Sequence, residues 1–145
     1  MIRNFGKLVV MTGLIGSTFA AVPAYAEAWK IENDKGLVIH NLNAAPFQLT
    51  LVCDPDGAFI PPQNYMLVKL SGKELKSGTL EVEQGDETAS LKIEAAAILA
   101  KNDAAEWNAA TNLLFAGGAV TLKADAKELR VELEPVSGNP CLPRG

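Results

Sequence analysis

Residues 78–93, GTLEVEQGDETASLKI, decide the fold class because apolar and polar side chains alternate on both sides of a short polar segment. Leu80 and Val82 precede this segment, and Leu91 and Ile93 follow it. Side chains in a strand point alternately to the two faces of a sheet, so the pattern predicts two half-buried antiparallel strands. A Gln-Gly-Asp sequence between them supplies the turn of a hairpin.

The same alternation recurs along most of the chain. Further strands are expected at residues 28–32, 36–42, 47–53 and 64–70, and a second hairpin at residues 119–135. No repeat, low-complexity run or domain boundary interrupts the series. The sequence therefore predicts a mainly β chain, a single-domain antiparallel β-sandwich or flattened barrel with one short helix and one disulfide.

The helix is expected within residues 101–118, KNDAAEWNAATNLLFAGG. Asn102 or Asp103 is placed to cap it, and Glu106 lies where a capping box requires an acidic side chain. Two consecutive glycines end the helical pattern. We predict a helix of about three turns and assign the preceding residues, through about Ala97, to the strand of the first hairpin.

The N-terminus has the pattern of an export signal. Two basic residues open the chain, residues 8–21 carry no charge, and Ala24-Tyr25-Ala26 matches the small-x-small sequence that signal peptidase cleaves. The uncharged run is shorter than the roughly 20 residues of a membrane anchor, although an uncleaved anchor is the alternative. We predict that residues 1–26 are a cleaved signal peptide and residues 27–145 a periplasmic or secreted domain without a membrane span.

Cleavage would change the charge balance. Removing Arg3 and Lys7 leaves 11 of the 13 basic residues against all 17 acidic ones, a net charge of −6. An acidic domain without a cluster of Lys and Arg is poorly suited to nucleic acid or to an anionic membrane surface. We therefore expect no nucleic-acid partner.

Cys53 and Cys141 are the only cysteines, and an even number in an oxidising compartment predicts one disulfide. A catalytic thiol needs a base, for which the chain offers only His40. No CxxC or HxxxH spacing suggests zinc, and Asp54 and Asp56 lack the remaining ligands of a calcium loop. We predict a structural disulfide, no metal and no cofactor.

Evidence for catalysis is weak along the whole chain. His40 ends the apolar run LVIH, where a histidine is usually a surface or half-buried side chain. Glu81 and Glu83 share one strand face and could hold two acids at a catalytic separation, but such faces are usually solvated. We predict no catalytic residues, and a hydrolase using these two carboxylates remains an alternative.

The loop DGAFIPPQNYM offers a candidate binding surface. Phe59 and Ile60 precede two prolines, so apolar side chains lie on a segment of restricted backbone freedom. A stiff loop binds a partner at a lower cost in ordering. Phe59, Ile60 and Asn64 are therefore our candidate contact residues. The alternative is that Phe59 and Ile60 fold back over the open end of the sandwich.

The layout resembles that of small periplasmic proteins of the invasion-associated locus B type. The residues that carry the resemblance are Ala28-Trp29-Lys30, Leu51-Val52-Cys53, the helix at 103–116 and LRVELE at 129–134. The tail SGNPCLPRG departs from it, because it lacks a closing Gly-Phe-x-x-Ala-type helix. The resemblance implies a β-sandwich in the periplasm or outer envelope of a Gram-negative bacterium and supplies no catalytic residues.

These observations favour an exported, non-enzymatic binding or accessory domain that recognises a protein or envelope component. A periplasmic carrier that holds a small apolar ligand between its sheets is the main alternative. The oligomeric state cannot be read from the sequence. An edge strand could pair two protomers, but the sequence selects neither that arrangement nor a monomer.

Overall fold

A computed structural model describes residues 26–142 of the 145-residue chain. The predicted signal peptide therefore lies, except for its last residue, outside the described residues. Within them, no helix is both long and apolar enough to cross a membrane.

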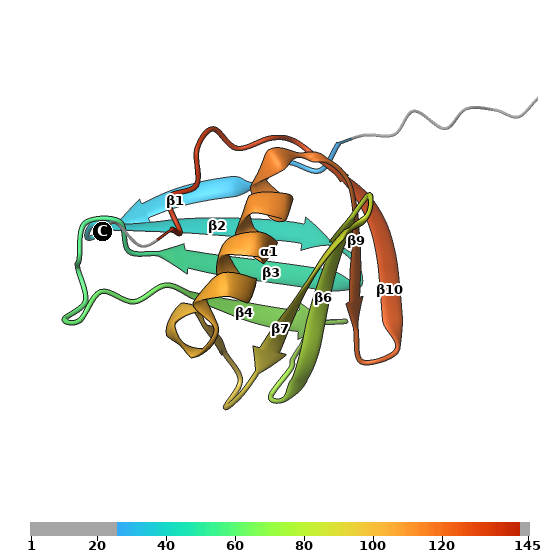
Figure 1. The fold of residues 1–145 in the computed structure, drawn as a ribbon, viewed down its shortest axis with the longest axis horizontal. Helices are drawn as coiled ribbons and strands as arrows, with labels where there is room; N and C mark the ends of the chain where they lie inside the picture. The colour runs from blue at the N-terminus through green and yellow to red at the C-terminus, as the bar shows by residue number, and fades with distance from the viewer. Residues whose placement is uncertain (1–25, 143–145) are drawn as a thin grey trace, which may run out of the picture.

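Two antiparallel sheets pack face to face (Figure 1). The first sheet has six strands: β1 (Lys30–Asp34), β2 (Leu37–Ala44), β3 (Phe47–Cys53), β4 (Tyr65–Leu70), β5 (Lys73–Glu74) and β8 (Ile98–Leu99). The second sheet has four: β6 (Gly78–Gln84), β7 (Glu87–Ile93), β9 (Gly118–Ala124) and β10 (Lys127–Leu133). In Figure 1 the strands of the second sheet run steeply across those of the first.

The strand order confirms the predicted β-sandwich. The first sheet is ordered β1-β2-β3-β4-β5, with β8 also paired to β4, and the second is ordered β10-β9-β6-β7. Neither order closes on itself within the described residues, so the fold is an open sandwich and not a barrel. The two predicted hairpins are β6–β7 and β9–β10, joined by two-residue turns.

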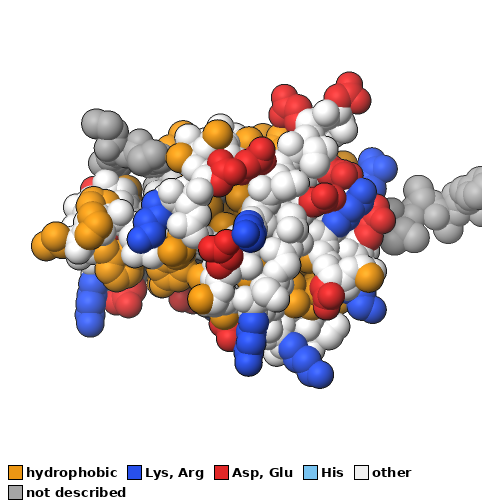
Figure 2. Space-filling model, turned by 60° about the horizontal axis from the view of Figure 1, so that its bottom comes forward, with side chains coloured by type: hydrophobic (Ala, Val, Ile, Leu, Met, Phe, Trp, Pro, Cys, Tyr) orange, Lys and Arg blue, Asp and Glu red, His pale blue; other side chains and the backbone are white. Residues whose placement is uncertain are grey.

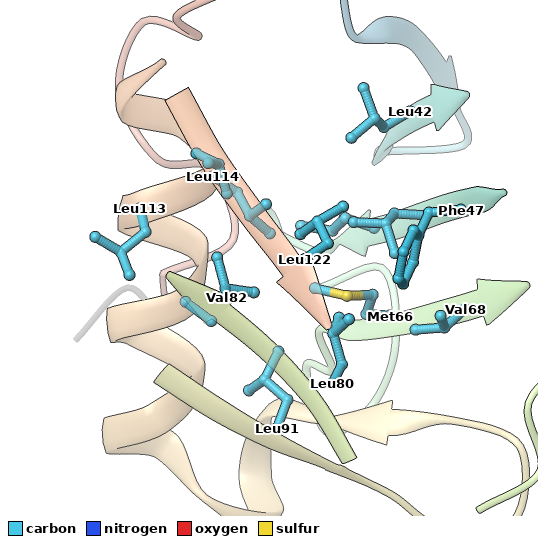
Figure 3. Packing of buried hydrophobic residues seen from close by; sticks show 14 of the residues in the cluster. Leu42, Phe47, Met66, Val68, Leu80, Val82, Leu91, Leu113, Leu114 and Leu122 are labelled. Atoms are coloured by element: carbon cyan, nitrogen blue, oxygen red, sulfur yellow. The ribbon is translucent and has the colours of Figure 1, made fainter. Parts of the chain in front are cut away.

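Alternation along the strands builds the core. In β7, for example, Ala89, Leu91 and Ile93 are buried, while the residues between them are exposed. Figure 3 shows Phe47 and Met66 of the first sheet pointing toward side chains of the second. Full burial of an aliphatic or aromatic side chain contributes about 1.5–3 kcal/mol, so the alternating positions provide most of the driving force for folding.

The helix α1 (Ala104–Ala116) lies beside the second sheet (Figure 1). It covers the face of the first sheet that the second sheet also covers. A short 3₁₀ turn, η1 (Ala100–Asn102), precedes it. The predicted cap is confirmed, because the Asp103 carboxylate accepts a hydrogen bond from the Glu106 N–H at 3.2 Å. The Glu106 side chain does not complete a capping box: it accepts a hydrogen bond from the Ser90 N–H on β7 at 2.8 Å.

Two predicted boundaries are wrong. The first strand was expected at residues 28–32 and lies at Lys30–Asp34. We expected the strand of the first hairpin to continue through about Ala97, but β7 ends at Ile93. Ala95 and Ala96 have φ angles of +50° and +65° and form a turn, after which β8 joins the first sheet. The run AAAIL has no period-two alternation, and Ile98 gains burial by pairing with β4, which explains why the chain changes sheets here.

Candidate functional site

The disulfide between Cys53 and Cys141 is the centre of one end of the molecule. It ties the last residue of β3 to the C-terminal tail, with the two Cα atoms 4.6 Å apart and both cysteines fully buried. The prediction of a structural disulfide is confirmed. The β3–β4 loop, residues 54–64, begins directly beyond this bond and forms the end of the molecule at the left of Figure 1.

Asp54 holds the base of the β3–β4 loop. One carboxylate oxygen accepts the Ala58 N–H at 2.6 Å, and the other accepts the N–H groups of Phe59 and Gln63 at 3.0 and 3.2 Å. Burial acts to raise the pKa of Asp54, but the backbone donors outweigh it and keep the pKa below its ordinary value. The carboxylate therefore stays ionised and closes the loop around itself at neutral pH.

Asn64 and Trp107 fasten the tail to the same place. The Asn64 side chain accepts the Asp54 N–H at 2.7 Å and donates to the Cys141 carbonyl at 2.8 Å. The Trp107 indole N–H donates to that carbonyl at 2.9 Å. Asn64 thus joins loop, strand and tail, and any contact it makes with a partner stays a prediction.

The tip of the β3–β4 loop exposes apolar side chains. Ile60 is 97% exposed and Phe59 is 38% exposed, so Ile60 does not fold back over the sandwich. The two prolines that follow restrict the backbone, and the space beside Gly57 is filled by Pro62. Figure 2 shows hydrophobic side chains gathered at the end of the molecule where this loop lies.

An apolar cavity of about 240 Å³ lies between this loop and α1. Among the described residues it is lined by four apolar side chains, those of Pro62, Ala100, Ala104 and Trp107, and by four polar ones, those of Gln63, Asn64, Lys101 and Asn108. Binding sites for small molecules usually have volumes of about 300–1,000 Å³. At about 240 Å³ the cavity lies just below this range.

His40 lies against the disulfide, which we did not foresee. Its Nδ1 atom is 3.8 Å from the Cys53 sulfur, and its ring contacts the rings of Phe115 and Trp29 at centroid distances of 4.9 and 6.3 Å. Burial lowers the pKa of His40. The expectation of a surface or half-buried histidine is wrong, because β2 continues to Ala44 and His40 faces inward at 1% exposure.

His40, Cys53 and Cys141 place three possible metal-ligand atoms within 4.8 Å of one another. The two sulfurs are bonded to each other, so the oxidised chain offers a single imidazole nitrogen here. A signal for this cluster was present in the sequence, since both His40 and Cys53 occupy inward positions of neighbouring strands. The missing information was the register that pairs β2 with β3.

Glu81 and Glu83 lie on the outer face of β6, as expected. Glu83 forms an ion pair with Lys123 on β9, with the oxygen and nitrogen atoms 3.0 Å apart. The hydrogen bond and the charge of Glu83 raise the pKa of Lys123. This pairing across two strands fits a solvated charged face, and the two carboxylates as a catalytic pair stay a prediction.

No family model matches this chain, and neither does a curated protein or a solved structure. The resemblance to proteins of the invasion-associated locus B type therefore stays a prediction based on layout.

Proposed function

We propose that this chain is an exported, non-enzymatic binding domain that captures a protein or envelope partner with the β3–β4 loop. The observation that carries the proposal is the exposure of Ile60, at 97%, on a loop whose base is held by Asp54 and by the disulfide. An isoleucine gains about 1.5–3 kcal/mol when a partner buries it fully. Because the loop is already ordered, little of that gain is lost in fixing its conformation.

The cavity beside the loop supports a protein as the partner. A partner segment lying across Ile60 could insert one apolar side chain between Pro62 and Trp107. An exposed apolar anchor next to a small pocket is the arrangement found at the centre of protein–protein interfaces. A protein or peptide can supply both the complementary pocket for Ile60 and the inserted side chain.

Two features support export. The only two cysteines are joined, and disulfides form and persist in oxidising compartments. The N-terminal pattern of basic, uncharged and small-x-small segments matches a secretory signal. Together they favour the periplasm or the extracellular space.

A capture experiment tests the proposal. Purified wild-type domain is immobilised and incubated with exported proteins and detergent-solubilised envelope from the source cells, and the bound proteins are identified. We expect a discrete partner that is lost from the double variant Phe59→Ser/Ile60→Ser. The matched control is Lys127→Ser/Glu128→Ser, which alters exposed residues of the β9–β10 hairpin, away from the loop.

The control variant should retain the partner, and both variants should unfold at temperatures close to that of the wild type. Capture that persists in the Phe59→Ser/Ile60→Ser variant would show that the loop does not bind the partner.

A further inference from the structure

The strand β1 is an open sheet edge. Within the part of the chain that the structure describes it pairs with β2 alone, and all five of its residues are exposed, including Ile31 at 49%. Each outer edge of the second sheet is partnered at one point within the described residues. The Glu106 side chain accepts the Ser90 N–H of β7, and Glu27 exchanges backbone hydrogen bonds with Glu132 at the end of β10 and with Glu134 just after it.

The hairpin register shows which backbone groups of β1 face outward. A two-residue turn joins Asp34 to Leu37, and these two residues are directly opposed. In such a hairpin the closing pair is hydrogen-bonded, and bonded and non-bonded pairs then alternate. Asp34, Glu32 and Lys30 therefore bond to β2, while the N–H and C=O groups of Ile31 and Asn33 point away from it. No hydrogen bond from another described residue reaches these outward groups.

We propose that two copies of this chain pair antiparallel along β1, with the two-fold axis at Ile31. In this register the outward backbone groups of Ile31 bond to those of Ile31 in the second copy, in both directions. The two exposed isoleucine side chains meet on one face. On the other face Lys30 of each copy lies opposite Glu32 of the other, at a non-bonded position where side chains approach most closely.

The charge pattern selects this register over its neighbours. A two-fold axis at Glu32 would place Glu32 opposite itself, and an axis at Asn33 would place Glu32 opposite Asp34. Both put like charges in direct opposition, which is destabilising. Within one strand, Lys30 and Glu32 already form an exposed ion pair, with the nitrogen and oxygen atoms 3.5 Å apart. With the axis at Ile31, two equivalent ion pairs form between the two strands. The interface is isologous and closes as a dimer.

Cysteine cross-linking tests both the pairing and the register. Bonded antiparallel residues have Cα atoms about 5.5 Å apart, which is within the range of roughly 4.4–6.8 Å that a disulfide spans. In the Ile31→Cys variant the two new cysteines face each other across the axis. In the Asn33→Cys variant they are four residue steps apart, or about 13 Å. Under mild oxidation at several hundred micromolar protein, non-reducing electrophoresis measures the covalent dimer.

We expect the Ile31→Cys variant to form the covalent dimer at least tenfold faster than the Asn33→Cys variant. Equal rates would overturn the register, and no dimer from either would overturn the pairing. Analytical sedimentation provides a second measurement of dimerisation, on proteins that carry no cysteine besides Cys53 and Cys141. Lys30→Glu should weaken dimerisation at least fivefold, and the exchange Lys30→Glu/Glu32→Lys should restore it. A Lys30→Glu variant that dimerises as strongly as the wild type would contradict the charge pairing.

Discussion

Removing the disulfide is the perturbation whose magnitude follows most directly from the structure. Cys53 and Cys141 are 88 residues apart. The chain-entropy relation for a loop of that length gives about 4.6 kcal/mol of stabilisation through the unfolded state. A domain of roughly 120 residues unfolds with an entropy near 0.25 kcal/mol/K. The double variant Cys53→Ala/Cys141→Ala should therefore melt about 15–20 °C below the wild type.

Differential scanning calorimetry of both proteins, without reductant, measures this difference. The wild type with a reductant should approach the variant, since both then lack the cross-link. A fall of less than about 5 °C would refute the reasoning. It would mean that the cross-link restricts the unfolded chain far less than the chain-entropy relation requires.

Three further predictions follow from single residues. Gly117→Ala should lower the free energy of unfolding by about 1–3 kcal/mol more than Gly72→Ala in urea titrations. Both glycines have φ near +78°, but a Cβ on Gly117 would lie 2.8 Å from the backbone of Pro135, whereas one on Gly72 meets nothing within 4 Å; equal losses would contradict the clash. Burial lowers the pKa of His40 below 6.5, so the unfolded chain binds a proton that the folded chain excludes, and stability should fall as the pH drops below about 6.5. His40→Gln should remove this part of the pH dependence, and an unchanged slope would argue against a buried neutral imidazole. The pKa of Asp54 is lower in the folded chain than its ordinary value of 3.8, so the ionised carboxylate stabilises the fold at pH values above 3.8. This stabilisation is lost as the pH falls through the pKa of the folded chain. Asp54→Asn should remove that acid-side loss and speed hydrogen exchange in the β3–β4 loop at neutral pH, and unchanged exchange there would show that other contacts order the loop.

The parts of the fold that could be predicted from the sequence are those in which local pattern and global packing agree. The β6–β7 hairpin has strict alternation and a polar turn, so its strands, its buried face and its turn all followed from residues 78–93. The disulfide followed from counting, because a chain with two cysteines in an oxidising compartment has one pairing. The helix followed from a cap at Asn102 or Asp103 and from its terminal glycines, and the structure selects Asp103.

The parts that failed depend on contacts between distant segments. The switch of the chain between sheets at residues 94–97 depends on β4, which offers Ile98 a buried partner. The role of Glu106 depends on β7 packing beside the helix, which brings the Ser90 N–H within reach of its carboxylate. The packing of His40 depends on Trp29 and Phe115, which lie far apart in the sequence. The partners in these contacts have no local signature.

The candidate site was predictable only in part. The exposed tip at Ile60 was one of two interpretations of the sequence, because the two prolines restrict the loop but Phe59 and Ile60 could also have folded back over the sandwich. The hydrogen bonds from the loop backbone to the Asp54 carboxylate were not expected, because the sequence Asp-Pro-Asp-Gly also fits a simple tight turn. The position of Asn64 in the chain gave no hint that its side chain bonds both to Asp54 and to the carbonyl of Cys141, which is 77 residues away from Asn64.

The central claim is that the β3–β4 loop meets a partner through Ile60, and site-specific photo-cross-linking tests it most directly. A photoreactive benzoylphenylalanine replaces Ile60 in one strain and Lys127 in another, and whole cells are irradiated after the protein has been exported. The account predicts a discrete cross-linked protein from position 60 that is absent from position 127. No adduct at position 60, or the same adducts from both positions, would contradict it.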